Sequence, residues 1–181
     1  MLEIVVPLTP EGWDEEKNEF VPPVTQTLQL EHSLVSISQW ESRWNKPFLS
    51  DKEKTNEEIL DYVKYMTLTP NVDPEVYNHL TSENVDDIHD YIGAAMTATT
   101  FSDDNNQKRN REVITAEIIY HWMIEWGIPL ECQYWHLSRL TTLIRVRSIK
   151  SQPPKKTSMK ERASRNARLN ALRRQQLNSK G

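Results

Sequence analysis

Two short stretches near the start of the chain have the composition and pattern of strands. Leu2–Val6 and Val24–Leu30 are rich in residues suited to strands, and polar and apolar residues alternate toward the end of the second. A two-residue repeat places every other side chain on one face of a strand. The segment between them, 8–23, holds three prolines and a glycine and is expected to be a loop. The pattern predicts a small N-terminal β-hairpin within residues 1–32.

From Ser33 onward the apolar residues recur every three or four positions, which is the period of a helix. Capping residues mark the expected starts, and proline or glycine marks most of the expected ends. The predicted helices are 33–45 capped by Ser33, one from the capping box Thr55-Asn56-Glu57-Glu58 to before Pro70, 74–80 after Asp73-Pro74, one capped by Thr81 or Ser82 and ending at Gly93, 112–126, and one from Pro129 to about Ile149.

The helical period also predicts which side of each helix is buried. The residues expected to face the core are Ile59, Leu60, Val63 and Met66 in the second helix, Val85, Ile88 and Ile92 in the fourth, and Val113, Ile114, Ile118, Ile119, Trp122, Met123 and Trp126 in the fifth. The expected fold class is therefore mainly α. It comprises a helical body over 33–150, a small N-terminal β-hairpin over 1–32 and a helical C-terminal arm over 151–181.

One polar segment interrupts the predicted body, and another ends it. Residues 102–111 are all polar, and an exposed loop is expected there. Ser151-Gln152-Pro153-Pro154 then breaks the last helix of the body, and the box Ser158-Met159-Lys160-Glu161 starts another that runs to about Leu177. Because this helix has few apolar residues, we expect the arm to be mobile.

Charge divides the chain at the same place. The formal charge of −4 combines −12 over residues 1–150 with +8 over residues 151–181. The arm's arginines could neutralise the phosphates of a nucleic acid, but the arm has no aromatic residue on which bases could stack. A contact with a protein partner is therefore the preferred interpretation, and a contact with the acidic body is a third.

Composition excludes further classes. The single cysteine, Cys132, allows no intramolecular disulfide, and the first residues lack the pattern of a secretory signal. No uninterrupted apolar stretch reaches the roughly 18 residues of a membrane-spanning helix. We therefore expect a protein that neither crosses a membrane nor is exported by the secretory route.

Candidate catalytic and metal-binding residues are few. Glu117 with His121 and Cys132 with His136 have spacings at which zinc ligands occur, but the flanking metal-site motifs are missing, so we prefer surface and core roles for them. The glycines do not cluster into a phosphate-binding loop, and no nucleophile motif is present. The sequence predicts a protein that is not an enzyme and has no cofactor.

Tryptophans occur in pairs one helical turn apart, Trp40 with Trp44 and Trp122 with Trp126. Core packing is the preferred interpretation, and the alternative is a groove for a partner helix. If the chain binds a partner, the residues that we expect to make contact are Trp40, Trp44, Arg165, Arg168, Arg173 and Arg174.

Two stretches resemble a known family. They are Leu28-Gln29-Leu30-Glu31-His32-Ser33-Leu34-Val35-Ser36 running into Trp40-Glu41-Ser42-Arg43-Trp44-Asn45-Lys46-Pro47-Phe48-Leu49, and Ile128-Pro129-Leu130-Glu131-Cys132-Gln133-Tyr134-Trp135-His136-Leu137 with Arg139-Leu140 and Leu143-Ile144. Together with Met96-Thr97-Ala98-Thr99 and the Arg165-to-Arg174 segment, they resemble the tail assembly chaperones of long-tailed, siphovirus-like bacteriophages. The similarity runs from about Leu28 to the C-terminus.

The resemblance implies a non-catalytic protein in the cytoplasm of the infected bacterium that is absent from the mature virion. Such a chaperone binds the helix-rich tape measure protein until tail tube subunits polymerise around it. Tail tube protein and self-association are further possible contacts, and a longer frameshifted form often accompanies the short one in that family. Two rival hypotheses are a nucleic-acid-binding accessory protein that uses the arm and a structural tail or head–tail connector component of the virion.

Overall fold

A computed structural model describes residues 1–10, 12–14, 18–101, 113–151 and 159–177. The chain divides into two compact units, Met1–Arg147 and Ser148–Gly181. Helices predominate, and the sheet structure is confined to the N-terminal part, as the sequence predicts. The expected loop at 102–111 and the expected break at 152–154 lie outside the described residues.

The predicted hairpin is present, with the expected alternation. Strand β1 (Leu2–Pro7) pairs antiparallel with β4 (Thr25–Leu30), so that Ile4 lies opposite Leu28. The inward-facing residues of this pair, Ile4, Val6, Leu28 and Leu30, are buried. The other face is exposed, which is the behaviour expected of a sheet packed on one side only.

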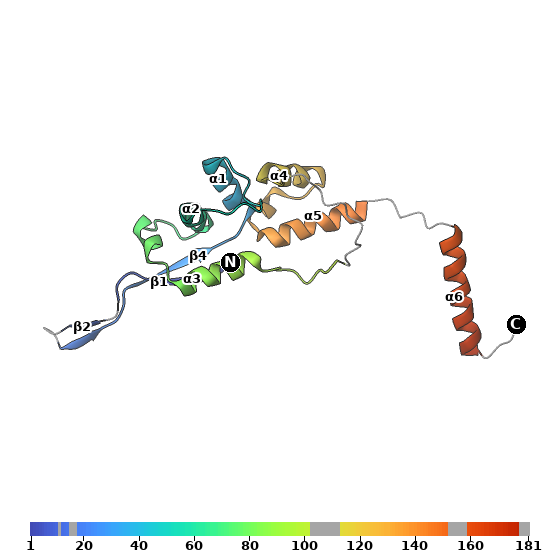
Figure 1. The fold of residues 1–181 in the computed structure, drawn as a ribbon, viewed down its shortest axis with the longest axis horizontal. Coiled ribbons are helices and arrows are strands. Elements are labelled where there is room, and N and C mark those ends of the chain that lie inside the picture. Colours follow the sequence, from blue (N-terminus) through green and yellow to red (C-terminus); the bar gives the residue numbers. More distant parts are fainter. Residues whose placement is uncertain (11, 15–17, 102–112, 152–158, 178–181) are drawn as a thin grey trace. The chain divides into compact units, whose positions relative to one another are not determined.

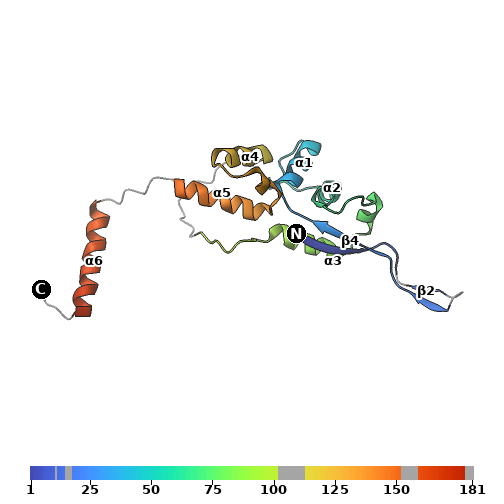
Figure 2. The same cartoon turned by 180° about the vertical axis from the view of Figure 1, so that it is seen from behind.

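The segment between these strands is not the plain loop that its prolines predict. Strands β2 (Gly12–Asp14) and β3 (Glu19–Val21) pair antiparallel, and Trp13 lies opposite Phe20. Asn18 adopts a left-handed conformation with φ 53° just before β3, where the chain reverses. The end of the hairpin that carries β2 extends away from the helices of this unit (Figures 1 and 2).

Helices α1 (Leu34–Trp44) and α2 (Asn56–Met66) begin at the predicted caps. Ser33 and Thr55 each accept a hydrogen bond from the third amide of their helix, and the side chain of that third residue accepts one from the backbone N–H of the cap. The predicted buried face of α2 is partly wrong, because Ile59 is 45% exposed whereas Glu58 and Tyr62 are buried. The capping box turns Glu58 inward and rotates the buried face.

The next two predicted helices are also present and begin after their predicted caps. The predicted short helix after Asp73 is a 3₁₀-helix, η1 (Pro74–His79), and α3 (Ser82–Gly93) begins after the cap Thr81. In α3 the third residue, Asn84, is buried and donates its side-chain amide to the backbone oxygen of Val5. This contact joins α3 to β1 and leaves the predicted core residue Val85 exposed.

The C-terminal half of the body differs most from the prediction. Helix α4 (Ala116–Glu125) starts later than expected and leaves Val113 and Ile114 exposed. Just after this helix, Gly127 adopts a left-handed conformation with φ 58°, which stops the helix from continuing. The following segment is a 3₁₀-helix, η2 (Leu130–Tyr134), and only then does α5 (Leu137–Ser151) begin.

A backbone contact explains the late start of α5. Ser33 forms an isolated β-bridge with His136, and the Leu137 N–H donates to the His32 carbonyl at 2.8 Å. Because these backbone groups bond to a distant segment, a continuous helix from Pro129 cannot form.

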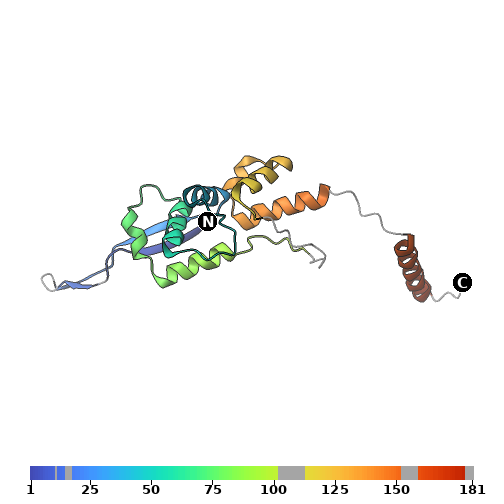
Figure 3. The same cartoon turned by 45° about the horizontal axis from the view of Figure 1, so that its top comes forward.

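The first unit has one hydrophobic core. The α1 helix packs against α2 and α4, while α3 lies beside β1 (Figures 1 and 3). The segment after α2 continues along the free edge of β4, since the Leu68 N–H donates to the Gln29 carbonyl at 2.7 Å. This core holds the β4–α1 junction at its centre.

The second unit contains α6 (Met159–Leu177), which begins next to the predicted cap and ends where the sequence predicts. Its side chains that the structure describes, Met159 and residues 163–177, are all exposed. Among the described residues, no helix is both long and apolar enough to cross a membrane.

Candidate functional site

The predicted contact residue Trp40 lies in the core rather than on a surface. Its side chain is 1% exposed, and its indole N–H donates to the Glu58 carbonyl at 2.8 Å. The Phe48 ring meets it edge-on, with centroids 5.1 Å apart. Trp40 therefore follows the core-packing interpretation and cannot present its ring to a partner while the body is folded.

Trp44, one turn later, is half-buried and has a different environment. Its ring lies 6.4 Å from that of Trp40 and has the Arg43 guanidinium at 5.8 Å and the Lys46 ammonium at 6.0 Å from its centroid. Its buried indole nitrogen has no hydrogen-bond partner within the described part of the chain. Of the tryptophan pair on α1, Trp44 alone is placed to contact another molecule.

Two buried carboxylates hold the chain around this pair, and the sequence analysis missed both. Glu41 accepts from the Phe48 N–H at 2.7 Å and from the Ala116 N–H at 2.8 Å, which ties α1 to the following loop and to the start of α4. Glu58 accepts from the Lys46 ammonium and from the Thr55 N–H. The Lys46 hydrogen bond, followed by the Thr55 backbone bond, lowers the pKa of Glu58.

A buried cluster of histidine and tyrosine lies at the β4–α1 junction. The rings of His32 and His136 are 5.1 Å apart, and His32 Nδ1 is hydrogen-bonded to the Tyr62 hydroxyl at 2.5 Å. Ser36 Oγ lies 3.3 Å from the same hydroxyl. Burial, with a smaller contribution from His136, lowers the pKa of His32 to about 4, and burial raises the pKa of Tyr62.

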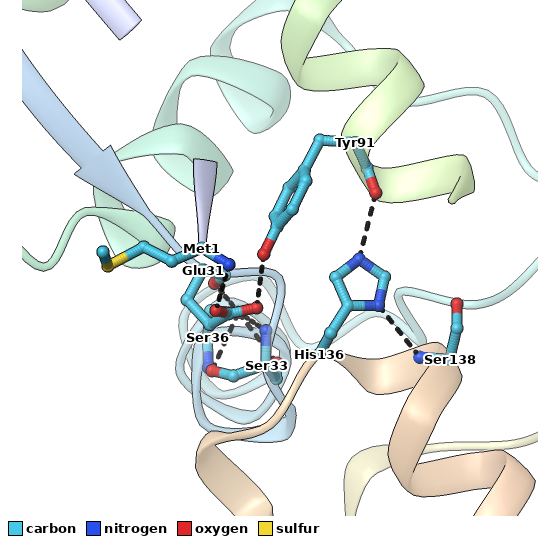
Figure 4. A network of polar contacts seen from close by, with 7 residues as sticks. All are labelled: Met1, Glu31, Ser33, Ser36, Tyr91, His136 and Ser138. Atoms are coloured by element: carbon cyan, nitrogen blue, oxygen red, sulfur yellow. Dashed lines mark hydrogen bonds and ion pairs between the residues drawn. The ribbon is translucent and has the colours of Figure 1, made fainter. Parts of the chain in front are cut away.

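The second half of the cluster joins α3 to the start of α5 (Figure 4). His136 Nε2 lies 3.0 Å from the Tyr91 carbonyl, and its Nδ1 accepts from the Ser138 N–H at 3.3 Å. Because a carbonyl only accepts and an amide N–H only donates, the His136 proton belongs on Nε2. The Tyr91 hydroxyl donates to Glu31 at 2.7 Å, and Glu31 also pairs with the Met1 amine at 2.9 Å.

This cluster can hold elements together, but its geometry does not suit catalysis. His32, Ser36, Tyr62 and His136 are all buried, so a substrate could not reach them in the folded body. Burial is also the main cause that raises the pKa of Tyr91, which keeps this hydroxyl protonated. The cluster fixes the junction of β4, α1, α3 and α5.

The residues considered for a zinc site are not brought together. Glu117 and His121 are exposed on α4, whereas Cys132 and His136 are buried. Within the described ranges, no group of three or more His, Cys, Asp or Glu side chains could hold a metal ion.

The four predicted contact arginines lie on α6, and all are exposed. Arg165 and Arg168 are three residues apart and lie on neighbouring positions of the helix surface, whereas Arg173 and Arg174 point to different sides. Leu169 and Leu172, which lie between Arg168 and Arg173 in the sequence, are 41% and 49% exposed. The helix offers cationic and apolar side chains together.

One exposed aromatic pair was missed by the sequence analysis. Trp13 on β2 and Phe20 on β3 lie opposite each other and are 60% and 58% exposed. Directly opposite residues of a strand pair share a face. The signal that could have found them is a pair of aromatic residues on either side of a short polar turn.

None of the protein-family models, curated proteins or solved structures compared with this chain matches it.

Proposed function

We propose that the chain is a bacteriophage tail assembly chaperone that binds the tape measure protein stoichiometrically and catalyses no reaction. The proposal rests on a contact between the two stretches that resemble this family. Residues 28–49 and 128–144 meet at the Ser33–His136 bridge and at the contact between His32 and His136. The resemblance thus falls on residues that form one structural unit rather than on unrelated surface segments.

The exposed side chains suit a client that is itself helical. A tape measure protein exposes apolar helical surface before the tube forms around it, and covering that surface prevents aggregation. Leu169 and Leu172 on α6 offer apolar contact, while Arg165 and Arg168 keep the complex soluble and attract acidic residues. Trp44 adds a half-exposed aromatic ring on the body.

The location follows from this role. We propose that the protein acts in the cytoplasm of the infected host and is left behind when the virion matures, because the tube subunits displace it from the tape. Displacement requires that the tube bind the tape more tightly than the chaperone does. Mass spectrometry of purified particles tests this step, since detection of the chain in stoichiometric amounts would identify a structural component of the virion instead.

The direct test is co-expression with the tape measure protein encoded by the same phage. We expect the tape to move from the insoluble to the soluble fraction and to co-purify with the chain. The double variant Arg165→Glu/Arg168→Glu should weaken this effect, and Arg147→Glu/Lys150→Glu, which makes the same charge change at exposed positions of α5, is the matched control. An insoluble tape and no co-purification with the wild-type chain would refute the proposal.

A nucleic-acid-binding role for the arm makes a different prediction. The chain alone would be retained on DNA or RNA at low salt, and retention would fall steeply as salt rises. Retention of this kind, together with failure to solubilise the tape, would favour that rival.

A further inference from the structure

The end of the N-terminal hairpin carries exposed apolar side chains with no role in the core. We call Trp13 and Phe20 the tip pair. Both rings lie on the same face of β2 and β3, and Val21 and Val24 nearby are 44% and 55% exposed. Two large aromatic side chains left exposed on a two-stranded ribbon favour binding to another surface.

The charge of the sequence that carries the tip pair indicates what kind of surface would bind. Residues 11–21 contain five acidic residues and one lysine, a net charge of −4. A partner should therefore be basic, and it should offer groups that pack on aromatic rings. Arginine meets both requirements, because its guanidinium stacks on aromatic faces and pairs with carboxylates.

The chain itself contains such a segment. Residues 159–177, which form α6, carry six basic residues and one acid, a net charge of +5. Arg165, Arg168, Leu169 and Leu172 follow the helical repeat, which places them along one side of α6, and all four are exposed. This helix can place guanidinium groups over the tip pair and leucines against the ring edges.

We propose that the tip pair of one copy binds the α6 helix of a second copy of this chain. The two surfaces differ, so the contact is heterologous: each chain has one tip to offer and one arm to donate. The contact requires nothing of the proposed function. If both hold, a client that engages the α6 arginines competes with the tip for them, so self-association falls as the client binds.

Sedimentation velocity of the full-length chain tests the contact. At low ionic strength the weight-average mass should rise with protein concentration. In about 1 M salt, where the Debye length is only ~3 Å, it should fall back toward the monomer. A mass that stays monomeric at every concentration in low salt would refute the proposal. An arm that binds the tip of its own chain would give this same monomeric mass and would also refute it.

Two double variants separate the surfaces, each with a matched control. Trp13→Ser/Phe20→Ser removes the tip pair, and Arg165→Glu/Arg168→Glu alters the arm. Each should be monomeric under conditions where the wild type associates. Ile124→Ser/Leu130→Ser removes two other side chains, 72% and 54% exposed, and Arg147→Glu/Lys150→Glu repeats the charge change on α5. Both controls should associate like the wild type.

Mixing the two monomeric variants gives the decisive result. The tip variant keeps a normal arm, and the arm variant keeps a normal tip, so an equimolar mixture should form one-to-one dimers. Far-ultraviolet circular dichroism of each variant checks that the body is folded. A mixture of folded variants that stays monomeric, or controls that dissociate as the test variants do, would overturn the proposal.

Discussion

The β4–α1 junction and α6 use polar residues in opposite ways. At the junction, His32, Ser36 and His136 are buried and bonded to groups from distant segments of the same chain. On α6 the described side chains are exposed, and arginines lie beside leucines that a core would have buried. The polar groups of the junction form their hydrogen bonds within the chain, whereas the exposed side chains of α6 are available to a partner. The difference separates residues that maintain the fold from residues that are available to partners.

The largest effect is expected when a buried side chain of α1 is removed. Trp40→Ala deletes a fully buried indole and its hydrogen bond to the Glu58 carbonyl, so it should lower the free energy of unfolding by about 3–5 kcal/mol. Urea denaturation followed by circular dichroism measures this change. Trp44→Ala, at a half-buried position, is the control and should cost clearly less. Equal losses would mean that both rings serve the core.

Acid should weaken the junction through His32. Its pKa is about 4 in the folded body and 6.5 as the reference value, so the unfolded chain binds more protons between these pH values. Stability should therefore be highest above pH 6.5 and fall as the pH drops toward 4, with roughly 3 kcal/mol from this group.

The change of stability with pH should be shallower in His32→Gln. His89, exposed on α3, provides the control, because His89→Gln should keep the wild-type slope. Denaturation midpoints measured between pH 4 and 7 for all three proteins give the comparison. A wild-type slope in His32→Gln would show that other groups cause the acid sensitivity.

Glu41→Gln should have a smaller effect. The two carboxylate oxygens accept backbone hydrogen bonds from Phe48 and Ala116, and an amide nitrogen at either place would face a donor. An unsatisfied buried group costs about 1–3 kcal/mol, and we expect a loss in that range. Glu117→Gln changes an exposed carboxylate on α4 and should leave the denaturation midpoint unchanged.

The smallest effect is expected on α6. Leu172 is 49% exposed, so Leu172→Ser should change the free energy of unfolding of the body by less than about 0.5 kcal/mol. The same variant should weaken self-association in the sedimentation experiment. A large loss of stability would instead show that Leu172 packs in a core and that α6 contributes to the stability of the fold.

The features predicted correctly from the sequence are local ones. The caps Ser33 and Thr55 depend on residues three positions apart, and the pairing of β1 with β4 follows from their alternation. The errors concern which face of a helix is buried and where a helix is interrupted. Glu58 and Asn84 are polar, so hydrophobic periodicity does not include them among the buried residues, although the capping boxes and a contact to β1 bury them.

The candidate site was less predictable than the fold. The His32–His136 contact joins segments far apart in the chain, and periodicity within either segment carries no information about the other. Proline in the segment 8–23 concealed the tip pair, because it normally interrupts strands. The Trp40–Trp44 spacing placed both rings on one side of α1, but it could not show that one ring is buried and the other only half-buried.

The Ser33–His136 bridge also has a consequence for synthesis on the ribosome. The hairpin and α1 emerge early, but the backbone partners of His32 and Ser33 are translated only with the segment around His136. The core therefore cannot close fully until α5 has been made, because Leu137, Leu140 and Ile144 belong to it. The protein that we propose as a chaperone would therefore expose part of its own apolar core for that interval.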